Sequence, residues 1–203
     1  MSPRTSPPGD WGAAQAPDAP LRADAARNVA QIRAAAIAAF HGRGLDTPLE
    51  EIAAAAGVSK ATIYNRFGGR SGLIDAVIGQ LVAAEMYAIM DKALQVADPW
   101  QAIASYVTDR RDLQYREPAF TDALLMAYAE SEQLAAIATA AIDMTVGLIQ
   151  RCHDAGAIRP DFTAADLHYA DVANGLALRK LPRPARQDYD RRTRFFLDSL
   201  RPR

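Results

Sequence analysis

Apolar side chains recur with helical spacing along nearly the whole chain. Between residues 24 and 41 the residues that form one such stripe are Val29, Ile32, Ala36, Ile37 and Phe40. No segment alternates Val, Ile or Tyr with polar residues over the length of a strand. The pattern therefore predicts an all-α protein.

Glycines, prolines and capping residues divide this pattern into about nine helices. The expected ranges are 24–41, 48–56, 60–67, 70–94, 99–117, 118–131, 132–155, 164–181 and 185–200. Thr47 and Glu50 have capping-box spacing and Pro48 suits a first helical position, while Ser59 is placed to cap the third helix. On the expected helix 70–94, the inward stripe is Leu73, Val77, Leu81, Ala84 and Ala88.

The chain divides into three parts. Residues 1–20 contain five prolines and one sizeable apolar anchor, Trp11, so we expect a disordered arm. Residues 21–69 contain the first three helices, and residues 70–203 form a larger helical domain. The charge differs between these regions: residues 22–70 hold seven basic and four acidic side chains, residues 71–180 eight and fifteen, and residues 181–203 seven and three.

Composition excludes several classes of protein. The lone Cys152 cannot form an internal disulfide, and no Cys or His spacing suits structural zinc, so we expect no metal and no cofactor. No run approaches the ~18 consecutive apolar residues of a membrane span, and the first twenty residues lack the apolar core of a signal peptide. We therefore expect a cytoplasmic protein.

The segment from Leu49 to Phe67 has the pattern of a helix-turn-helix. Gly57 permits the tight turn between two short helices, and Ala53 is small enough for them to cross closely. Five side chains that can reach phosphates and base edges remain on the outer face: Ser59, Lys60, Thr62, Asn65 and Arg66. An ordinary corner between two helices is the alternative interpretation.

Within residues 27–78, the stretch AAFHGRGLDTPLEEIAAAAGVSKATIYNRFGGRSGLIDAVI resembles the N-terminal domain of the TetR family of bacterial transcriptional regulators. The matching features are an aromatic residue before a glycine turn (Phe40, Gly44), then Ile52-Ala53, the run from Ala56 to Ser59, and Tyr64 with Phe67. Towards its end the chain also resembles, more faintly, an SbtR-type C-terminal domain.

The resemblance implies roles for particular residues. Thr47 corresponds to a residue whose helix start lies against a phosphate, and Tyr64 to a tyrosine that touches the DNA backbone. Arg70 stands where the family has Lys, and Gly69 where it has a capping side chain. Asn65 and Arg66 are expected to set sequence preference. The full DNA-binding set is Thr47, Ser59, Lys60, Thr62, Tyr64, Asn65, Arg66 and Arg70.

A single recognition helix buries little surface, so we expect a homodimer on a palindromic double-stranded operator. Residues with room or bulk for a dimer interface lie in the last two expected helices: Ala170, Ala173, Ala177, Tyr189, Phe195, Phe196 and Leu200. Residues that could line a pocket for a small-molecule effector are Tyr87, Met90, Trp100, Tyr106, Phe120, Met126, Tyr128, Met144 and His168, although the same spacing suits core packing.

The preferred hypothesis is a dimeric repressor that a small molecule releases from its operator. A DNA-binding module without an effector, controlled by a protein partner, is the second hypothesis, and a cavity smaller than about 300 Å³ would favour it. A small helical enzyme that uses Cys152, His153 or His168 is the third; the sequence shows no base, nucleophile and orienting group together.

Overall fold

The computed structural model describes residues 19–125 and 131–202, and every regular element within those ranges is helical. The helices are α1 (Ala19–Arg43), α2 (Leu49–Ala55), α3 (Lys60–Phe67), α4 (Arg70–Ile78), the π-helical turn η1 (Gly79–Ala83), α5 (Ala84–Gln95), α6 (Pro99–Arg116), α7 (Pro118–Leu125), α8 (Glu132–Asp154), α9 (Ala164–Lys180) and α10 (Arg186–Ser199). The all-α prediction is confirmed.

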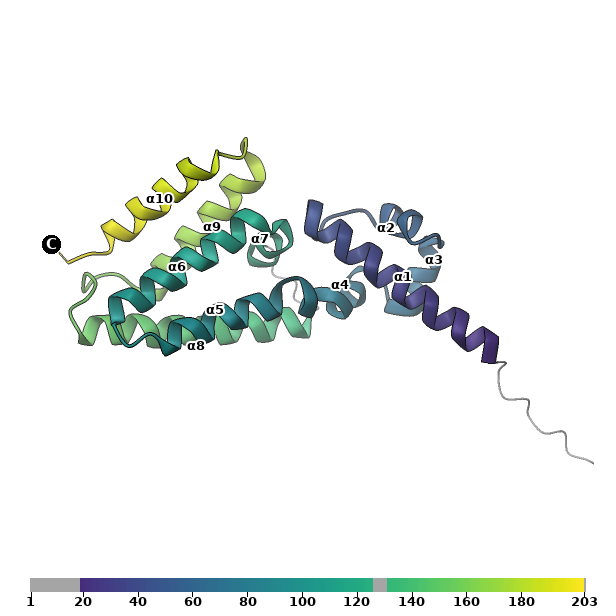
Figure 1. Ribbon diagram of the computed structural model, residues 1–203, viewed down its shortest axis with the longest axis horizontal. Coiled ribbons are helices and arrows are strands. Elements are labelled where there is room, and N and C mark those ends of the chain that lie inside the picture. The colour runs from purple at the N-terminus through teal and green to yellow at the C-terminus, as the bar shows by residue number, and fades with distance from the viewer. Residues whose placement is uncertain (1–18, 126–130, 203) are drawn as a thin grey trace, which may run out of the picture.

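Two lobes lie end to end (Figure 1). The smaller lobe contains α1, α2 and α3, and the larger contains α5 to α10, with α4 between them. One hydrophobic core runs through both lobes, from Ile32, Phe40 and Ile63 in the small lobe to Met86 and Tyr106 in the large one. Because the core is continuous, the lobes are packed against each other and are not joined by a free linker.

Most helix boundaries lie within two residues of the expected ones, and three differences bear on the predictions. Helix α1 begins at Ala19, which is five residues before Asp24 and inside the expected arm; residues 1–18 lie outside the described part. Helix α7 ends at Leu125, and residues 126–130 of the expected helix 118–131 also lie outside it. Helix α2 begins at Leu49, so Pro48 is its N-cap and not its first helical residue.

The capping predictions divide in two. As expected, Ser59 caps α3 by accepting a hydrogen bond from the Thr62 N–H at 3.2 Å. A full capping box is present elsewhere, at the start of α9, where it is formed by Thr163 and Asp166. The capping box predicted for Thr47 and Glu50 is wrong. The buried Thr47 hydroxyl instead donates to the Gly44 carbonyl at 2.8 Å, and Glu50 pairs with Lys60.

The expected single helix 70–94 is present as the continuous run α4–η1–α5, but its inward stripe changes register. Leu73, Val77 and Leu81 are buried as expected, whereas Ala84 and Ala88 are exposed. After η1 the buried residues are Met86, Met90 and Ala93. A π-helical turn holds one more residue than an α-helical turn, so every position after it moves around the helix axis.

Within the described part of the chain, two helical segments are long and apolar enough to cross a membrane by length and composition, Arg70–Gln95 and Glu132–Asp154. In the protein both pack against other helices, and their large inward side chains, such as Leu73 and Leu148, lie in the core. Buried helices of a globular domain pass the same test, so this feature is weak support for a membrane location.

The loop between α1 and α2 is held by a side chain of the other lobe. Asp122 on α7 accepts a hydrogen bond from the Leu45 N–H at 2.8 Å and pairs with Arg179 of α9 at 2.8 Å. Gly44 has φ +94°, and a Cβ there would lie 2.0 Å from the Asp122 carboxylate. Burial raises the pKa of the Asp122 carboxyl, although Arg179 and the Leu45 N–H favour its charged form.

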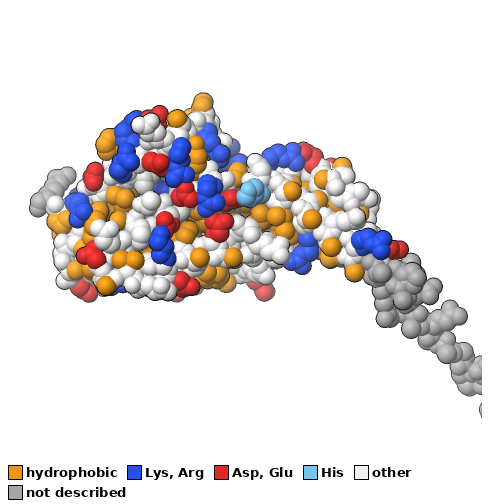
Figure 2. All heavy atoms as spheres, in the orientation of Figure 1, with side chains coloured by type: hydrophobic (Ala, Val, Ile, Leu, Met, Phe, Trp, Pro, Cys, Tyr) orange, Lys and Arg blue, Asp and Glu red, His pale blue; other side chains and the backbone are white. Residues whose placement is uncertain are grey.

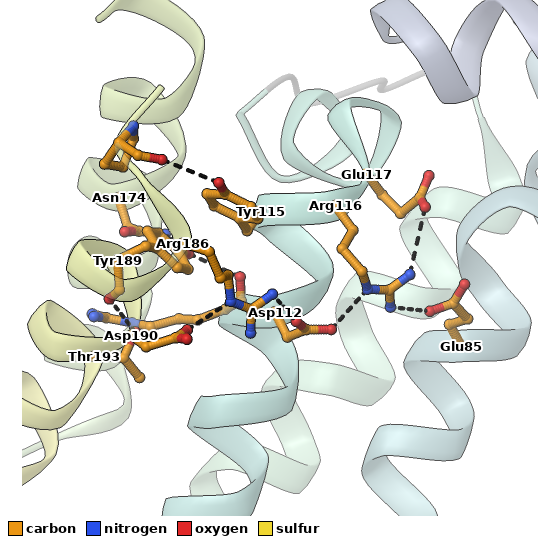
Figure 3. A network of polar contacts seen from close by, with 12 residues as sticks. Glu85, Asp112, Tyr115, Arg116, Glu117, Asn174, Arg186, Tyr189, Asp190 and Thr193 are labelled. Atoms are coloured by element: carbon orange, nitrogen blue, oxygen red, sulfur yellow. Dashed lines mark hydrogen bonds and ion pairs between the residues drawn. The ribbon is translucent and has the colours of Figure 1, made fainter. Parts of the chain in front are cut away.

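Polar contacts attach α10 to the large lobe (Figure 3). Arg186 on α10 pairs with Asp112 of α6 at 2.5 Å, and Arg116 joins Asp112 to Glu85 of α5 at 2.7 Å each. The Tyr189 hydroxyl donates to the Arg111 carbonyl at 2.8 Å and accepts from the Asn174 amide at 2.7 Å. Helix α10 is therefore fixed to α6 and α9 by hydrogen bonds and ion pairs in addition to apolar packing.

Replacing Asp122 by Ala should lower the free energy of unfolding by roughly 1–3 kcal/mol, because it leaves the Leu45 N–H and the Arg179 guanidinium without their buried acceptor. The matched control is Asp109→Ala, which removes the more exposed pair with Lys92 and should cost at most about 1 kcal/mol. Urea unfolding of both variants measures the difference. Equal losses would show that the loop does not depend on Asp122.

Cys152 should be inert in the native protein. Its thiol is fully buried, its Sγ donates to the Pro99 carbonyl at 3.2 Å, and burial raises its pKa to about 11. A raised pKa favours the neutral thiol, so the reactive thiolate becomes common only as the pH approaches that value. A disulfide reagent at pH 8 should label Cys152 slowly in native protein and rapidly in guanidinium chloride; rapid native labelling would contradict its burial.

Candidate nucleic-acid interface

The turn between α2 and α3 has the geometry that the sequence indicated. Gly57 adopts φ +67°, and the next residue, Val58, donates its N–H to the Ala53 carbonyl at 3.0 Å. Ile52, Ala53 and Ile63 fill the angle between the two helices and are buried. With its apolar side fixed in this way, α3 presents its opposite side to solvent at the end of the molecule (Figure 1).

The start of α3 is polar and accessible. Ser59 is exposed, and its hydroxyl lies 2.9 Å from the Thr62 hydroxyl. The N–H groups of a first helical turn have no partners within the helix and carry partial positive charge, which favours anions. The first turn of α3 thus combines hydroxyl groups with a positive helix end, and both can bind phosphate oxygens.

Lys60 is paired with an acidic residue of the preceding helix. Its ammonium group lies 2.5 Å from the Glu50 carboxylate, and this contact raises the pKa of Lys60 and lowers that of Glu50. Both side chains are about half exposed, so water screens the pair and it contributes little to stability. A phosphate can compete with Glu50 for the Lys60 ammonium.

Asn65 and Arg66 follow on the exposed side of α3. Among the residues that the structure describes, neither has a hydrogen bond or an ion pair. Tyr64 is half exposed and its ring covers Gly69, where an added Cβ would lie 3.0 Å from the ring. As expected from the glycine at that position, α4 begins without a side-chain cap.

Two residues of the predicted DNA-binding set are part of the scaffold. Only 4% of Thr47 is exposed, so its hydroxyl does not face outward. Arg70 is partly buried and donates from one terminal nitrogen to the carbonyls of Leu45 and Thr47, at 2.6 and 2.8 Å. The Thr47 side chain is therefore buried and not placed to contact DNA, contrary to expectation. The Arg70 side chain joins α4 to the loop before α2.

The acidic residues of α2 lower the net positive charge of this surface, which the sequence pattern did not predict. Glu50 pairs with Lys60, and Glu51 pairs with Arg43 at the end of α1. Figure 2 shows Lys and Arg side chains along the edges of the small lobe, some of them beside acidic side chains. Because these pairs join separate helices, no sequence spacing reveals them.

Of the nine residues proposed for an effector pocket, the seven that the structure describes do not come together. Met90, Tyr106 and Met144 are core residues, Tyr87 is exposed, and the Trp100 ring is covered by Arg201 at 3.5 Å. Phe120 lines a small cavity of about 70 Å³ among η1, α5, α6, α7 and α8, and His168 lines an adjoining cavity of about 390 Å³ among α6, α7, α8 and α9. Met126 and Tyr128 lie outside the described residues.

Of the seven residues proposed for a dimer interface, some are buried within the chain and others are exposed. Tyr189 and Leu200 are buried within the chain itself, at 3% and 2% exposed, so the structure corrects the expectation that they form an outer surface. Phe196 is half-buried against the Arg111 guanidinium at 4.2 Å. Phe195 is 63% exposed and Ala173 is also exposed, while Ala170 and Ala177 are half-buried.

Comparison with known proteins points to one family. Residues 32–77, which span α2, α3 and parts of α1 and α4, match the model of bacterial regulatory proteins of the tetR family. No curated protein matches the chain in sequence.

Solved structures extend the likeness to the large lobe. A TetR transcriptional regulator from Streptomyces coelicolor is 28% identical, with a TM-score of 0.53 over 85% of this chain and 98% of that one. The regulator PfmR from Thermus thermophilus is 20% identical, with a TM-score of 0.61 over 82% and 94% of the two chains. AibR, solved with isovaleryl coenzyme A and operator DNA, is 19% identical, with a TM-score of 0.65 over 86% and 97%.

The family model covers the helix-turn-helix, and the solved structures share the arrangement of both lobes. Residues 32–77 are therefore similar to bacterial regulatory proteins of the tetR family, with α2 and α3 in the place of the helix-turn-helix, and both lobes share the fold of solved TetR-type regulators.

Proposed function

We propose that this protein is a homodimeric repressor that acts in the bacterial cytoplasm, binds a palindromic operator through α3 and is released from it by a small molecule. The observation that carries the DNA-binding part is the outer side of α3, where Ser59, Lys60, Asn65 and Arg66 are exposed at the end of the small lobe. These residue types contact phosphates and base edges when a helix lies in a major groove.

The exposed side of α9 and α10 supports the proposed dimer. Tyr169 and Leu176 lie two helical turns apart on α9 and are 71% and 45% exposed, and Phe195 on α10 is 63% exposed. A two-fold axis through this surface would place one α3 at each end of the assembly. Two recognition helices of a dimer then read half-sites about 34–36 Å apart.

The larger of the two cavities supports the proposed effector. Its volume of about 390 Å³ lies within the range of ligand pockets, roughly 300–1,000 Å³, whereas a module without an effector is expected to have a filled core. AibR was solved with both isovaleryl coenzyme A and operator DNA, so this fold is compatible with ligand and DNA recognition.

One helix, α7, connects the cavity to the small lobe. Ala123 and Leu124 on α7 line the cavity, and the adjacent Asp122 holds the Leu45 N–H. Arg70 joins α4 to the same loop. A ligand that prefers a different position of α7 therefore prefers a different orientation of the recognition helix, and it lowers DNA affinity by its differential affinity for the two states.

The chemistry of Cys152 gives little support to the enzyme hypothesis. Its buried thiol is the opposite of a nucleophile activated by a lowered pKa. We therefore infer regulation as the function.

Lys60→Ala should weaken binding to all duplexes because it removes a phosphate contact, and it should reduce the slope of log affinity against log salt by about 1. Asn65→Ala should alter the preference among duplexes selected from a random pool. Fluorescence polarisation over a series of salt concentrations measures both effects.

Two matched variants sharpen this test. Lys92→Ala removes another exposed lysine that pairs with an acid, in the large lobe, and should leave DNA binding unchanged. Glu50→Gln should strengthen binding, because it releases Lys60 and removes a negative charge close to the phosphates. Wild-type affinity in both Lys60→Ala and Asn65→Ala would refute the assignment of α3.

Leu176→Glu should convert the dimer to monomer, because it places a charge without a partner in a desolvated interface. It should also weaken operator binding. Leu94→Glu is the control, since Leu94 is 56% exposed on α5 and lies outside the proposed interface. Sedimentation velocity distinguishes the two variants, and an unchanged dimer in Leu176→Glu would exclude this surface.

A further inference from the structure

We propose that the cavity among α6, α7, α8 and α9 binds an amphipathic monoanion, with an apolar body against the cavity walls and a carboxylate on Arg110. This inference rests on the proposed function and names the chemical class of its effector.

Most of the cavity wall is apolar. Helices α7, α8 and α9 contribute Ala123, Leu124, Ala138, Ala141, Ile142 and Leu167. The polar side chains among the lining residues are Arg110, Thr145 and His168. Thr145 is already occupied, because its hydroxyl donates to the Ala141 carbonyl at 2.7 Å and lies 3.0 Å from the Tyr106 hydroxyl. His168 is exposed, whereas Arg110 is buried, so Arg110 is the polar group best placed to fix a ligand.

Arg110 is buried and incompletely satisfied. It is 7% exposed, and it lines both the larger cavity and the small adjoining one. One terminal nitrogen lies 2.8 Å from the Asp171 carboxylate, and the guanidinium lies over the Tyr106 ring at 5.1 Å. Its Nε has no hydrogen-bond partner within the described part of the chain. A buried donor without a partner is costly, and a ligand with an acceptor removes that cost.

The charges around Arg110 do not balance. Asp171 is the carboxylate that faces both Arg110, at 2.8 Å, and Arg111, at 4.0 Å. His168, the other titratable group that acts on Asp171, adds no negative charge in either protonation state. Two guanidinium groups thus share one carboxylate, which leaves one positive charge uncompensated in a region of low dielectric.

Arg111 is not positioned to take the ligand. Its guanidinium lies against the Phe196 ring at 4.2 Å, on the side of α10, and Arg111 is absent from the residues that line the cavity. The excess charge therefore acts on a ligand through Arg110. A carboxylate matches the planar guanidinium and neutralises the cluster, whereas a neutral ligand leaves the charge and a cation adds to it.

The size of the cavity limits the body of the ligand. About 390 Å³ lies near the lower end of the range for small-molecule sites. A medium-length acyl chain or a compact ring system fits this volume. The inferred effector is thus a small apolar carboxylic acid.

Three ligands with the same alkyl chain test the head group: decanoate, 1-decanol and decylammonium, each titrated calorimetrically into the full-length protein without DNA. Decanoate should bind about tenfold more tightly than 1-decanol, or better, and decylammonium should bind most weakly. Equal affinities, a preference for decylammonium, or no binding of any of the three would overturn the proposal.

Variants locate the site. Arg110→Gln combined with Asp171→Asn removes both charges of the pair, and it should abolish the preference for decanoate over 1-decanol. Ala138→Phe should block binding by filling the cavity from α8, whereas Ala136→Phe, also at an exposed position of α8 but outside the lining, should leave it unchanged. Retained preference in the double variant or unchanged binding in Ala138→Phe would contradict the assignment.

A duplex-binding measurement on the same wild-type preparation separates this inference from the proposed function. DNA binding together with no selectivity for decanoate would reject the ligand class and leave the DNA-binding regulator intact. Loss of selective DNA binding in wild type would instead refute the proposed function.

Discussion

The position of the recognition helix depends on the hydrogen bonds that two helices, α7 and α4, make with the backbone of one residue, Leu45. Its N–H donates to Asp122 of α7, and its carbonyl accepts from Arg70 of α4. A backbone amide bonded on both sides to separate helices has little freedom to shift unless one of those helices moves. The α1–α2 loop, and with it the helix-turn-helix, is therefore oriented by two elements of which one, α7, also lines a cavity.

On the proposed DNA-binding surface, acidic side chains partly neutralise the basic ones that would attract phosphates. Glu50 and Glu51 pair with Lys60 and Arg43, so the free protein presents less positive charge than its residue count suggests. Such exposed pairs exchange partners at little cost. In the proposed complex with DNA, phosphates displace the carboxylates and make this charge available, which would lower non-specific attraction more than binding to a well-fitted site.

Local features explain which parts of the structure could be predicted from the sequence. The helix-turn-helix follows from Gly57, Ser59 and the apolar positions around them, because each acts within a few residues. Contacts between distant segments left no such signal. The burial of Thr47, the pairing of Glu50 with Lys60, and the use of Tyr189 inside the protomer all depend on residues on other helices. Most of the cavity lining likewise escaped prediction. Of the residues expected there, His168 lines the larger cavity and Phe120 the smaller one, whereas small alanine side chains and a buried arginine form most of the larger cavity.

The π-helical turn at Gly79–Ala83 allows one continuous helix to pack against the small lobe before the turn and against the large lobe after it. Before the turn, Leu73 and Val77 face the core shared with the small lobe; after it, Met86 and Met90 face the core of the large lobe. An uninterrupted α-helix would carry Ala84 and Ala88 inward instead, and those methyl groups are too small to fill the space that the methionines occupy. The extra residue in that turn therefore sets the rotation of the second half of the helix about its axis. Removing it would rotate that half by about 100° and turn its two methionines away from their packing partners.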